Sequence, residues 1–277
     1  MCRTATGAAA KLRIAGWPTV AFAWKLRKSG GMKIRKLFFA AGLMVLISVP
    51  AVSTAMSYYA IDDGKPSVCY GNAVHGRLEN AKRLPYVGAN YRAYHIGGFL
   101  VGRTFMHSSV RDTIRDAYAA LAASDPELRF VYAEASWPWG GRLRPHRTHA
   151  NGTSVDFMVP VRDNAGQVRE LTGSVVNMLG YAIRFDNDGK GDGVNIDFEA
   201  MAKHLIALKE AAKAHNIRIS RVIFEPPLLK HLRKAPSGHK LKGINFMNTR
   251  AWFRHDQHYH VDFAVRCKKL RRGRRHR

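Results

Sequence analysis

Two short segments of the chain, residues 146–156 and 255–262, concentrate the residue types that bind metal ions. In the second segment histidine recurs at alternate positions, and a strand would place His258, His260 and Asp262 on one face. The opposite face would be apolar and suited to a core, with Tyr259, Val261 and Phe263. Because neutral imidazole is a common zinc ligand, the polar face indicates a metal site.

The first segment carries His149 and Asp156, which are seven residues apart. Gly152 lies between them and permits a tight turn, so the chain can leave His149 and enter a strand that holds Asp156. In that strand Ser154 and Asp156 point to one face and Val155 to the other. Two ligands from one segment and a distant third from another are typical of catalytic zinc. Water then fills the fourth position, and zinc lowers its pKa to about 7.

At these residues the chain resembles a group of zinc peptidases whose signature is HxxxxxxD followed by a later HxH. The group includes lysostaphin, D-Ala-D-Ala carboxypeptidases and penicillin-insensitive murein endopeptidase, and the resemblance to the last is the strongest. It is also carried by Gly-Gly-Arg at 140–142 and by Trp-Phe at 252–253, just before HxxHxH. The resemblance covers residues 71–267.

The resemblance implies a zinc site with three protein ligands, which are His149, Asp156 and His260. It implies that His258 lies beside the metal-bound water as a base or transition-state stabiliser, and that His146 and His255 flank the site. The implied activity is cleavage of the peptide cross-links of murein, so the implied partner is peptidoglycan. The implied fold is an α+β domain around a small antiparallel sheet.

Some relatives are described with a second metal site, formed by the histidine at His146, an Asp-Gly-Lys segment and a following histidine. Here Asp188 begins such a segment, but Gly191 stands where the histidine would be, and Asp192 is the available substitute. We therefore expect one zinc ion. His146 and Asp188 remain the residues of a second metal site, or residues that flank the first.

The rest of the sequence predicts the elements that position these residues. Apolar residues at helical spacing predict helices over 110–121, capped by Ser108-Ser109, and over 198–214, capped by Asp197. The predicted strands are residues 129–135, 154–161, 217–224 and 258–265. Helices and strands are mixed without a regular βαβ rhythm. We therefore expect a single α+β domain with a small, mainly antiparallel sheet flanked by helices.

Both ends of the chain differ in composition from the predicted domain. Residues 32–55 combine bases, an apolar run and small residues before the end, which is typical of a secretory signal peptide; an uncleaved membrane anchor is the alternative. We then expect Met32 to be the true start, with residues 1–31 an upstream segment misread in frame. Residues 56–267 form the zinc peptidase domain, and residues 268–277 a basic disordered tail. We therefore expect a periplasmic protein.

Charge and cysteines agree with export. The formal net charge is +25, and much of it lies at the two ends. Export argues against a specific nucleic-acid partner, so we expect weak contact of the basic tail with anionic envelope surfaces. Cys2 lies in the upstream segment, whereas Cys69 and Cys267 could form a disulfide in an oxidising compartment. No CxxC pattern occurs, which argues against a thiolate zinc site.

Two other functions fit the same residues. One is a D,D-carboxypeptidase that trims free stem peptides, and the other is a non-catalytic wall-binding protein with a structural zinc. A structural site is usually closed by a fourth protein ligand, so an open metal position would separate an enzyme from a binding protein. Glu225 is an alternative base, although its position favours a structural role. Trp137, Trp139 and Tyr259 are candidates for lining a substrate groove.

Overall fold

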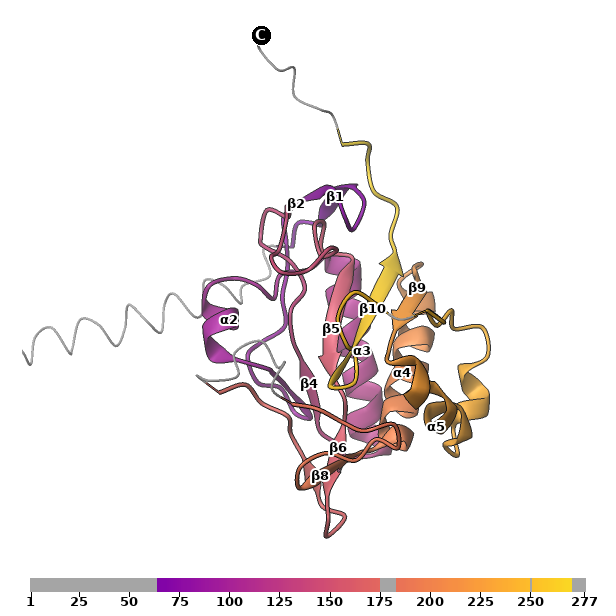
Figure 1. The fold of residues 1–277 in the computed structure, drawn as a ribbon. Coiled ribbons are helices and arrows are strands. Elements are labelled where there is room, and N and C mark those ends of the chain that lie inside the picture. Colours follow the sequence, from indigo (N-terminus) through magenta and orange to yellow (C-terminus); the bar gives the residue numbers. More distant parts are fainter. Residues whose placement is uncertain (1–63, 175–182, 250, 271–277) are drawn as a thin grey trace, which may run out of the picture. The chain divides into compact units, whose positions relative to one another are not determined.

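A five-stranded sheet with the order β3-β4-β5-β10-β9 carries both histidine-rich segments (Figure 1). The computed structural model describes residues 64–174, 183–249 and 251–270. The five strands are, in that order, Tyr91–Ala93, Phe130–Tyr132, Ser154–Met158, His258–Ala264 and Arg218–Ile223. β3 pairs with β4 in parallel, and the other neighbours are antiparallel.

The antiparallel pairing of β5 with β10 sets the two segments beside each other. Asp156 lies opposite His260, and Met158 lies opposite His258. Opposed residues on neighbouring strands hold their Cβ atoms roughly 4.5–5.5 Å apart. The register of the two strands therefore brings a carboxylate next to an imidazole, although the two residues are 104 positions apart in the sequence.

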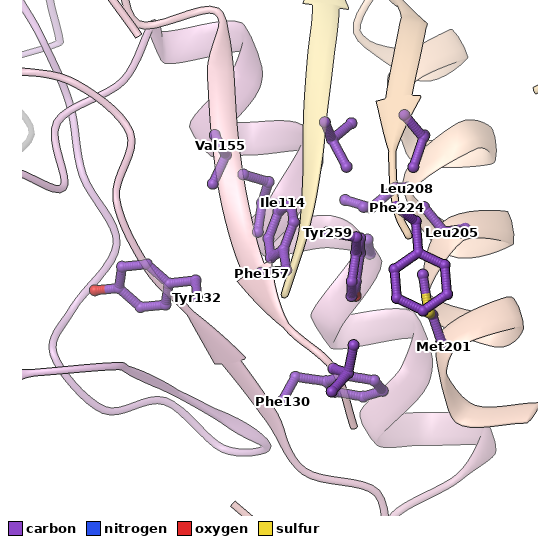
Figure 2. Packing of buried hydrophobic residues seen from close by; sticks show 14 of the residues in the cluster. Ile114, Phe130, Tyr132, Val155, Phe157, Met201, Leu205, Leu208, Phe224 and Tyr259 are labelled. Carbon is purple, nitrogen blue, oxygen red and sulfur yellow. The ribbon is translucent and has the colours of Figure 1, made fainter. Parts of the chain in front are cut away.

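Two long helices, α3 (Ser108–Ser124) and α4 (Phe198–Ala214), cover the apolar face of this sheet. Figure 2 shows Ile114 of α3 and Leu205 of α4 beside Phe157 and Tyr259 of the strands, all in one hydrophobic core. A shift of one residue in the pairing of β5 and β10 would turn the histidine face into this core. Because the apolar face of β5 and β10 is buried in the core, the residues that alternate with it, including Asp156 and His260, are directed to the opposite face of the sheet.

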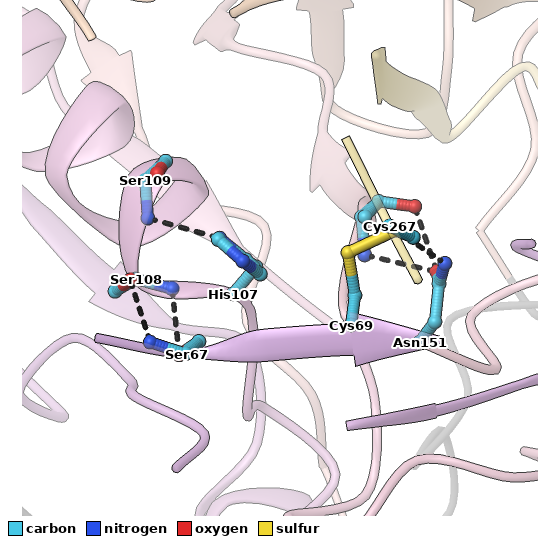
Figure 3. Close-up of a disulfide and its surroundings, with 8 residues drawn as sticks. Ser67, Cys69, His107, Ser108, Ser109, Asn151 and Cys267 are labelled. Carbon is cyan, nitrogen blue, oxygen red and sulfur yellow. Dashed lines mark hydrogen bonds between the residues drawn. A yellow bond between two sulfur atoms is a disulfide. The ribbon is translucent and has the colours of Figure 1, made fainter. Parts of the chain in front are cut away.

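Of the capping residues predicted for the two long helices, the one for α4 is confirmed and the one for α3 is not. Asp197 caps α4, as predicted, by accepting a hydrogen bond from the backbone N–H of Ala200 at 2.9 Å. The predicted Ser108-Ser109 cap of α3 is wrong, because the cap is His107, whose Nδ1 accepts from Ser109 N at 3.2 Å (Figure 3). A histidine cap is uncommon and leaves no clear sequence signal.

The remaining elements are short. β1 (Val68–Gly71) and β2 (Gly76–Glu79) form a hairpin. β7 (Val168–Arg169), β6 (Val161–Asp163) and β8 (Val194–Ile196) form a three-stranded antiparallel sheet. The short helices are α2 (Ile96–Leu100), η2 (Pro226–Leu228), α5 (Leu229–Lys234) and η3 (Gly238–Leu241). These elements complete an α+β domain with small, mainly antiparallel sheets, which confirms the predicted fold class.

Strand lengths depart from the predictions in two places. The predicted strand 154–161 is two strands, β5 and β6, since Pro160 lies between them and has no N–H to donate to a ladder. The predicted strand 129–135 contributes only Phe130–Tyr132 to the sheet. The proposed segments 1–31 and 32–55 lie outside the described residues. Within the part of the chain that is described, no helix is long and apolar enough to span a membrane.

A disulfide joins Cys69 to Cys267, as the sequence allowed (Figure 3). The segment after β10 returns to β1, where Lys268 N donates to Cys69 O and Gly71 N donates to Lys268 O, each at 2.8 Å. Asn151, within the histidine-rich segment 146–156, donates from Nδ2 to the Cys267 sulfur at 3.4 Å. The cross-link therefore ties both ends of the domain to the loop that enters β5.

Loss of this disulfide should destabilise the domain without moving the sheet. The two cysteines are 198 residues apart, and a cross-link over so long a loop restricts the unfolded chain. We expect Cys69→Ser/Cys267→Ser to lower the free energy of unfolding by about 2–4 kcal/mol, measured by denaturant titration. Two alkylatable thiols at these positions in denatured, unreduced wild type would contradict the cross-link.

Candidate metal centre

Asp156 is the centre of a buried group of ionisable side chains. Its Oδ1 lies 2.8 Å from His260 Nδ1, and its Oδ2 lies 3.3 Å from His149 Nε2. All three residues are buried. Burial raises the pKa of Asp156, but the neighbouring His149 and His260 outweigh it and hold that pKa well below its usual range. Asp156 is therefore a carboxylate that two imidazole nitrogens face.

The turn before β5 places His149 against this carboxylate. His149 has a φ of 73°, and Gly152 a φ of +73°, so the segment makes a left-handed bend at both positions. A Cβ at Gly152 would come within 2.8 Å of His107 N, so glycine is required there. The Nδ1 atom of His149 lies 2.7 Å from Ala135 O, while its Nε2 is buried without a hydrogen-bond partner.

Asp262 fixes the orientation of His260. Its Oδ1 accepts from His260 Nε2 at 2.8 Å and from Ser154 Oγ at 2.6 Å, and Arg221 donates twice to its Oδ2. Burial would lower the pKa of His260, but the carboxylates of Asp262 and Asp156 raise it to about 10. The site thus stabilises a cation at His260 Nδ1, where a metal ion and a proton compete.

Both imidazoles follow the pattern of metal-ligating histidines. In each ring, one nitrogen is hydrogen-bonded to a group outside the cluster, which is Ala135 O for His149 and Asp262 for His260. The other nitrogen faces Asp156. Such partners fix the tautomer and direction of a ligand. Two imidazole nitrogens and a carboxylate oxygen form a donor set that suits zinc. The residues present therefore fit the expected metal.

His146 joins the same group from the side. Among the described residues, potential ligand atoms of His146, His149 and Asp156 lie within 4.8 Å of one another, which is compatible with a bound metal ion. The Nδ1 of His146 is 3.5 Å from Asp156 Oδ2, and its Nε2 is bonded to Glu134. Arg103 in turn pairs with Glu134. Burial would raise the pKa of Glu134, but His146 and Arg103 lower it to about 2.

His258 and His255 lie beside the cluster, with ring centroids 4.6 Å apart. His258 is buried on the same face of β10 as His260, and burial lowers its pKa to about 3. His255 Nδ1 lies 2.8 Å from Phe253 O. Glu225 accepts from the backbone N–H of His255 at 3.0 Å, which supports a structural role for this glutamate.

Other residues singled out in the sequence lie elsewhere. Asp188 is exposed, and its described contacts are with His231 at 3.4 Å and Lys230 at 3.9 Å rather than with His146. Tyr259 is fully buried in the core and does not line a groove. Trp137 and Trp139 stack on each other with centroids 6.1 Å apart, and Trp139 is exposed.

Two cavities adjoin the cluster. The larger, of about 380 Å³, lies between residues 145–148 and 251–258 and includes the exposed Trp252. The smaller, of about 40 Å³, lies between α2 and strands β4 and β5, and Asp156 lines it. His146 and His258 line both cavities. Two cavities that share His146 and His258 in their walls therefore adjoin the cluster.

Removing the charge of Asp262 should weaken metal binding. In Asp262→Asn the side chain keeps its shape, but it no longer strengthens His260 as a ligand. Loss of such a supporting partner typically costs about 10–100-fold in metal affinity, and we expect a zinc dissociation constant raised by that factor. Competition with a fluorescent chelator measures it. Arg169→Gln is the control, because it removes a different ion pair, the one between Arg169 and Asp163. An unchanged zinc affinity in Asp262→Asn would refute the supporting role of Asp262.

Comparison with known proteins gives one result. The family model of penicillin-insensitive murein endopeptidase matches residues 69–273, a range that contains every member of the cluster. No curated protein sequence shows a significant match. Since the match spans most of the chain and both histidine-rich segments, the chain belongs to the penicillin-insensitive murein endopeptidase family.

Proposed function

We propose that the protein is a zinc metalloendopeptidase that hydrolyses the peptide cross-links of peptidoglycan. The family supports a murein peptidase. Zinc dependence rests on one observation: His149, Asp156 and His260 form a buried group in which each imidazole turns one nitrogen toward the carboxylate.

The proposed ligands are His149 Nε2, a carboxylate oxygen of Asp156 and His260 Nδ1. Buried polar atoms are nearly always hydrogen-bonded, but His149 Nε2 makes no hydrogen bond and has the Asp156 carboxylate 3.3 Å away, as a nitrogen that shares a metal with this carboxylate would. When bound, zinc supplies Lewis acidity and lowers the pKa of a water molecule to about 7. Three protein ligands are the number usual in catalytic zinc sites.

We assign proton transfer to His258. It neighbours His260 on the polar face of β10 and lines both cavities beside the cluster. A neutral imidazole can accept the proton of the attacking water and return it to the leaving amine. His255 lies beside His258 and His146 beside Asp156, where both can orient the substrate peptide.

The two cavities favour an endopeptidase over a D,D-carboxypeptidase. An enzyme that cuts inside a cross-link must hold peptide on both sides of the scissile bond, and His146 and His258 line both cavities, so two parts of a substrate can bind beside them. A wall-binding protein with a structural zinc would need neither cavity, and it would close the metal with a fourth ligand. His146 is the nearest residue for that role: its Nε2 is bonded to Glu134, whereas its Nδ1 lies 3.5 Å from Asp156 Oδ2, so coordination by this nitrogen would favour the structural zinc.

An enzyme that acts on murein works outside the cytoplasm, in the periplasm in our proposal. We retain residues 32–55 as a signal peptide. Lys268, the first residue of the expected tail 268–277, is bonded to β1, so we place the tail that touches anionic envelope surfaces weakly after it. A specific nucleic-acid partner is not part of the proposal. The mature chain should begin near Met56, which N-terminal sequencing of the exported protein measures; an intact apolar segment at 37–49 would show an anchor instead.

Digestion of purified murein tests the proposed function. The protein should release uncrosslinked muropeptides with newly exposed amine and carboxyl groups, identified by mass spectrometry. A chelator should stop the release, and zinc should restore it. Release of a single terminal residue from free stem peptides, with cross-links left intact, would favour the carboxypeptidase. No cleavage with zinc bound would favour the wall-binding protein.

A further inference from the structure

The segment that follows β9 and Glu225 carries positive charge without any negative charge. Residues 226–255 contain no aspartate or glutamate, and they include η2, α5 and η3. The proposed mechanism uses none of the lysine or arginine side chains of this segment. Five of these side chains are exposed, and we call them the basic face: Lys230, Arg233, Lys234, Lys240 and Lys242.

The basic face lacks the carboxylate partners that exposed bases have elsewhere in the domain. Lys213 on α4, for example, pairs with Glu210 at 2.8 Å. Within the described part of the chain, four bases of the basic face make no ion pair, and the fifth, Lys230, lies 3.9 Å from Asp188. Neighbouring positive charges that are not neutralised create a field that attracts an anionic partner.

The backbone that carries these bases is bonded to α4. Lys209 Nζ donates to Lys240 O at 3.3 Å and to Lys242 O at 3.0 Å. At the start of η3, Ser237 donates to the carboxylate of Glu199 from its backbone N at 2.8 Å and from its Oγ at 2.6 Å. These bonds hold η3 on α4, so the charges of the basic face keep a fixed arrangement.

The basic face lies on the outer side of the helix layer, where α5 neighbours α4 (Figure 1). α4 turns Leu205 and Leu208 toward the core, whereas Glu199, which binds η3, lies on the opposite side of the helix. The proposed metal ligands Asp156 and His260 lie on the other face of the sheet. A partner on the basic face therefore leaves the metal cluster accessible.

A groove of about 240 Å³ adjoins the basic face between α3 and α4. Leu121 and Ile206 supply apolar walls, and Lys240 of the basic face also lines the groove. Lys203 lines it as well, but its ammonium group is paired with Asp125. The groove thus combines apolar surface with one unpaired cation, which suits an amphiphilic anion.

We propose that the basic face and this groove dock the protein on an anionic phospholipid membrane. Phosphate headgroups complement the unpaired bases, and the groove takes the apolar part of a lipid beside Lys240. The carboxylates of murein would match the charge of the basic face but not the apolar groove. A protein bound in this way directs the metal cluster away from the membrane. The inference does not depend on the proposed function.

Binding to vesicles tests the membrane surface. The exported protein is titrated with vesicles of phosphatidylglycerol and phosphatidylcholine in equal parts, and with vesicles of phosphatidylcholine alone. Wild type should bind the anionic vesicles more tightly, and salt should weaken this binding. Arg233→Gln/Lys234→Gln/Lys240→Gln removes three bases of the basic face. Since a base near an anionic surface adds roughly fivefold in affinity, we expect a loss of about 100-fold.

Arg77→Gln/Arg169→Gln/Lys213→Gln is the matched control, because it removes three exposed bases that are each paired with a carboxylate. The control should bind like wild type, and thermal unfolding checks the fold of both variants. Equal loss in the two variants, no loss in the first, or equal binding of wild type to both kinds of vesicle would overturn the proposal. Tighter binding to isolated murein sacculi, lost in the first variant, would assign the basic face to wall carboxylates instead.

The groove has a test of its own. Ala119 and Ala120 are both exposed on α3, and of the two Ala120 lines the groove. Calorimetry with a short-chain phosphatidylglycerol, which dissolves as single molecules, measures lipid binding without a bilayer. Ala120→Trp should fill the groove and abolish this binding, whereas Ala119→Trp should leave it unchanged. A wild type that does not bind this lipid, or equal affinity in the two variants, would overturn the lipid assignment of the groove.

Discussion

Replacing His149 with alanine is expected to remove the metal and to abolish cross-link cleavage together. His149 contributes the one cluster nitrogen that is buried without a hydrogen-bond partner, and its position is set by Ala135 O and by the left-handed bend of its own backbone. Without it, two ligands remain. Since a bound metal supplies several kcal/mol of transition-state stabilisation, we expect a fall in kcat/KM of about 10³-fold or more.

Elemental analysis and murein digestion measure the two losses in the same preparation. His239→Ala is the matched control, because His239 is an exposed histidine on η3 and should keep both zinc and activity. Circular dichroism and thermal unfolding of the zinc-free proteins check that the fold survives the change in a buried residue. A His149→Ala protein with a full complement of zinc would show that the ligand is another residue, with His146 the first to test.

Replacing His258 with alanine is expected to separate chemistry from metal binding. His258 shares the polar face of β10 with His260, yet the imidazole nitrogens that face Asp156 come from His146, His149 and His260. The variant should therefore bind zinc like wild type. A positioned proton-transfer group is worth about 10²–10⁴-fold in rate, and cleavage should fall by that factor.

The same zinc analysis and digestion decide this second prediction, with His255→Ala as a neighbouring comparison. The His255 ring lies 4.6 Å from that of His258, but its Nδ1 is directed at Phe253 O, so we expect a smaller loss of rate. Loss of zinc in His258→Ala would make His258 a ligand and would point to a closed, structural site. Full zinc with full activity would move the base elsewhere.

Alternation along β5 and β10 predicted which of the candidate site residues share a face of the sheet. Period-2 patterning predicts which residues share a face, and the apolar residues opposite, such as Phe157 and Val261, fix that face toward the core. The pairing of Asp156 with His260 then follows once the two strands are neighbours. Periodicity alone does not tell which strands pair. That β5 and β10 are neighbours was indicated by the family signature, in which HxxxxxxD is followed by a later HxH.

The surroundings of the site could not be predicted in this way. Arg103 and Glu134 are 31 residues apart, in segments with no shared pattern, and only the folded chain places both beside His146. Asp188 shows the opposite case, a sequence motif that did not predict the contact. The motif suggested a metal site with His146, but in the folded chain Asp188 lies beside His231 of α5. Side-chain pairs between distant segments depend on packing, which single-sequence periodicity does not contain.

Anomalous diffraction at the zinc edge from crystals of the zinc-loaded protein tests the central claim most directly. A single strong peak within about 2.0–2.2 Å of His149 Nε2, an Asp156 carboxylate oxygen and His260 Nδ1 is the predicted result, with the fourth position open to solvent and facing His258. A peak closed by four protein ligands, or one centred away from Asp156, would contradict the proposed catalytic site.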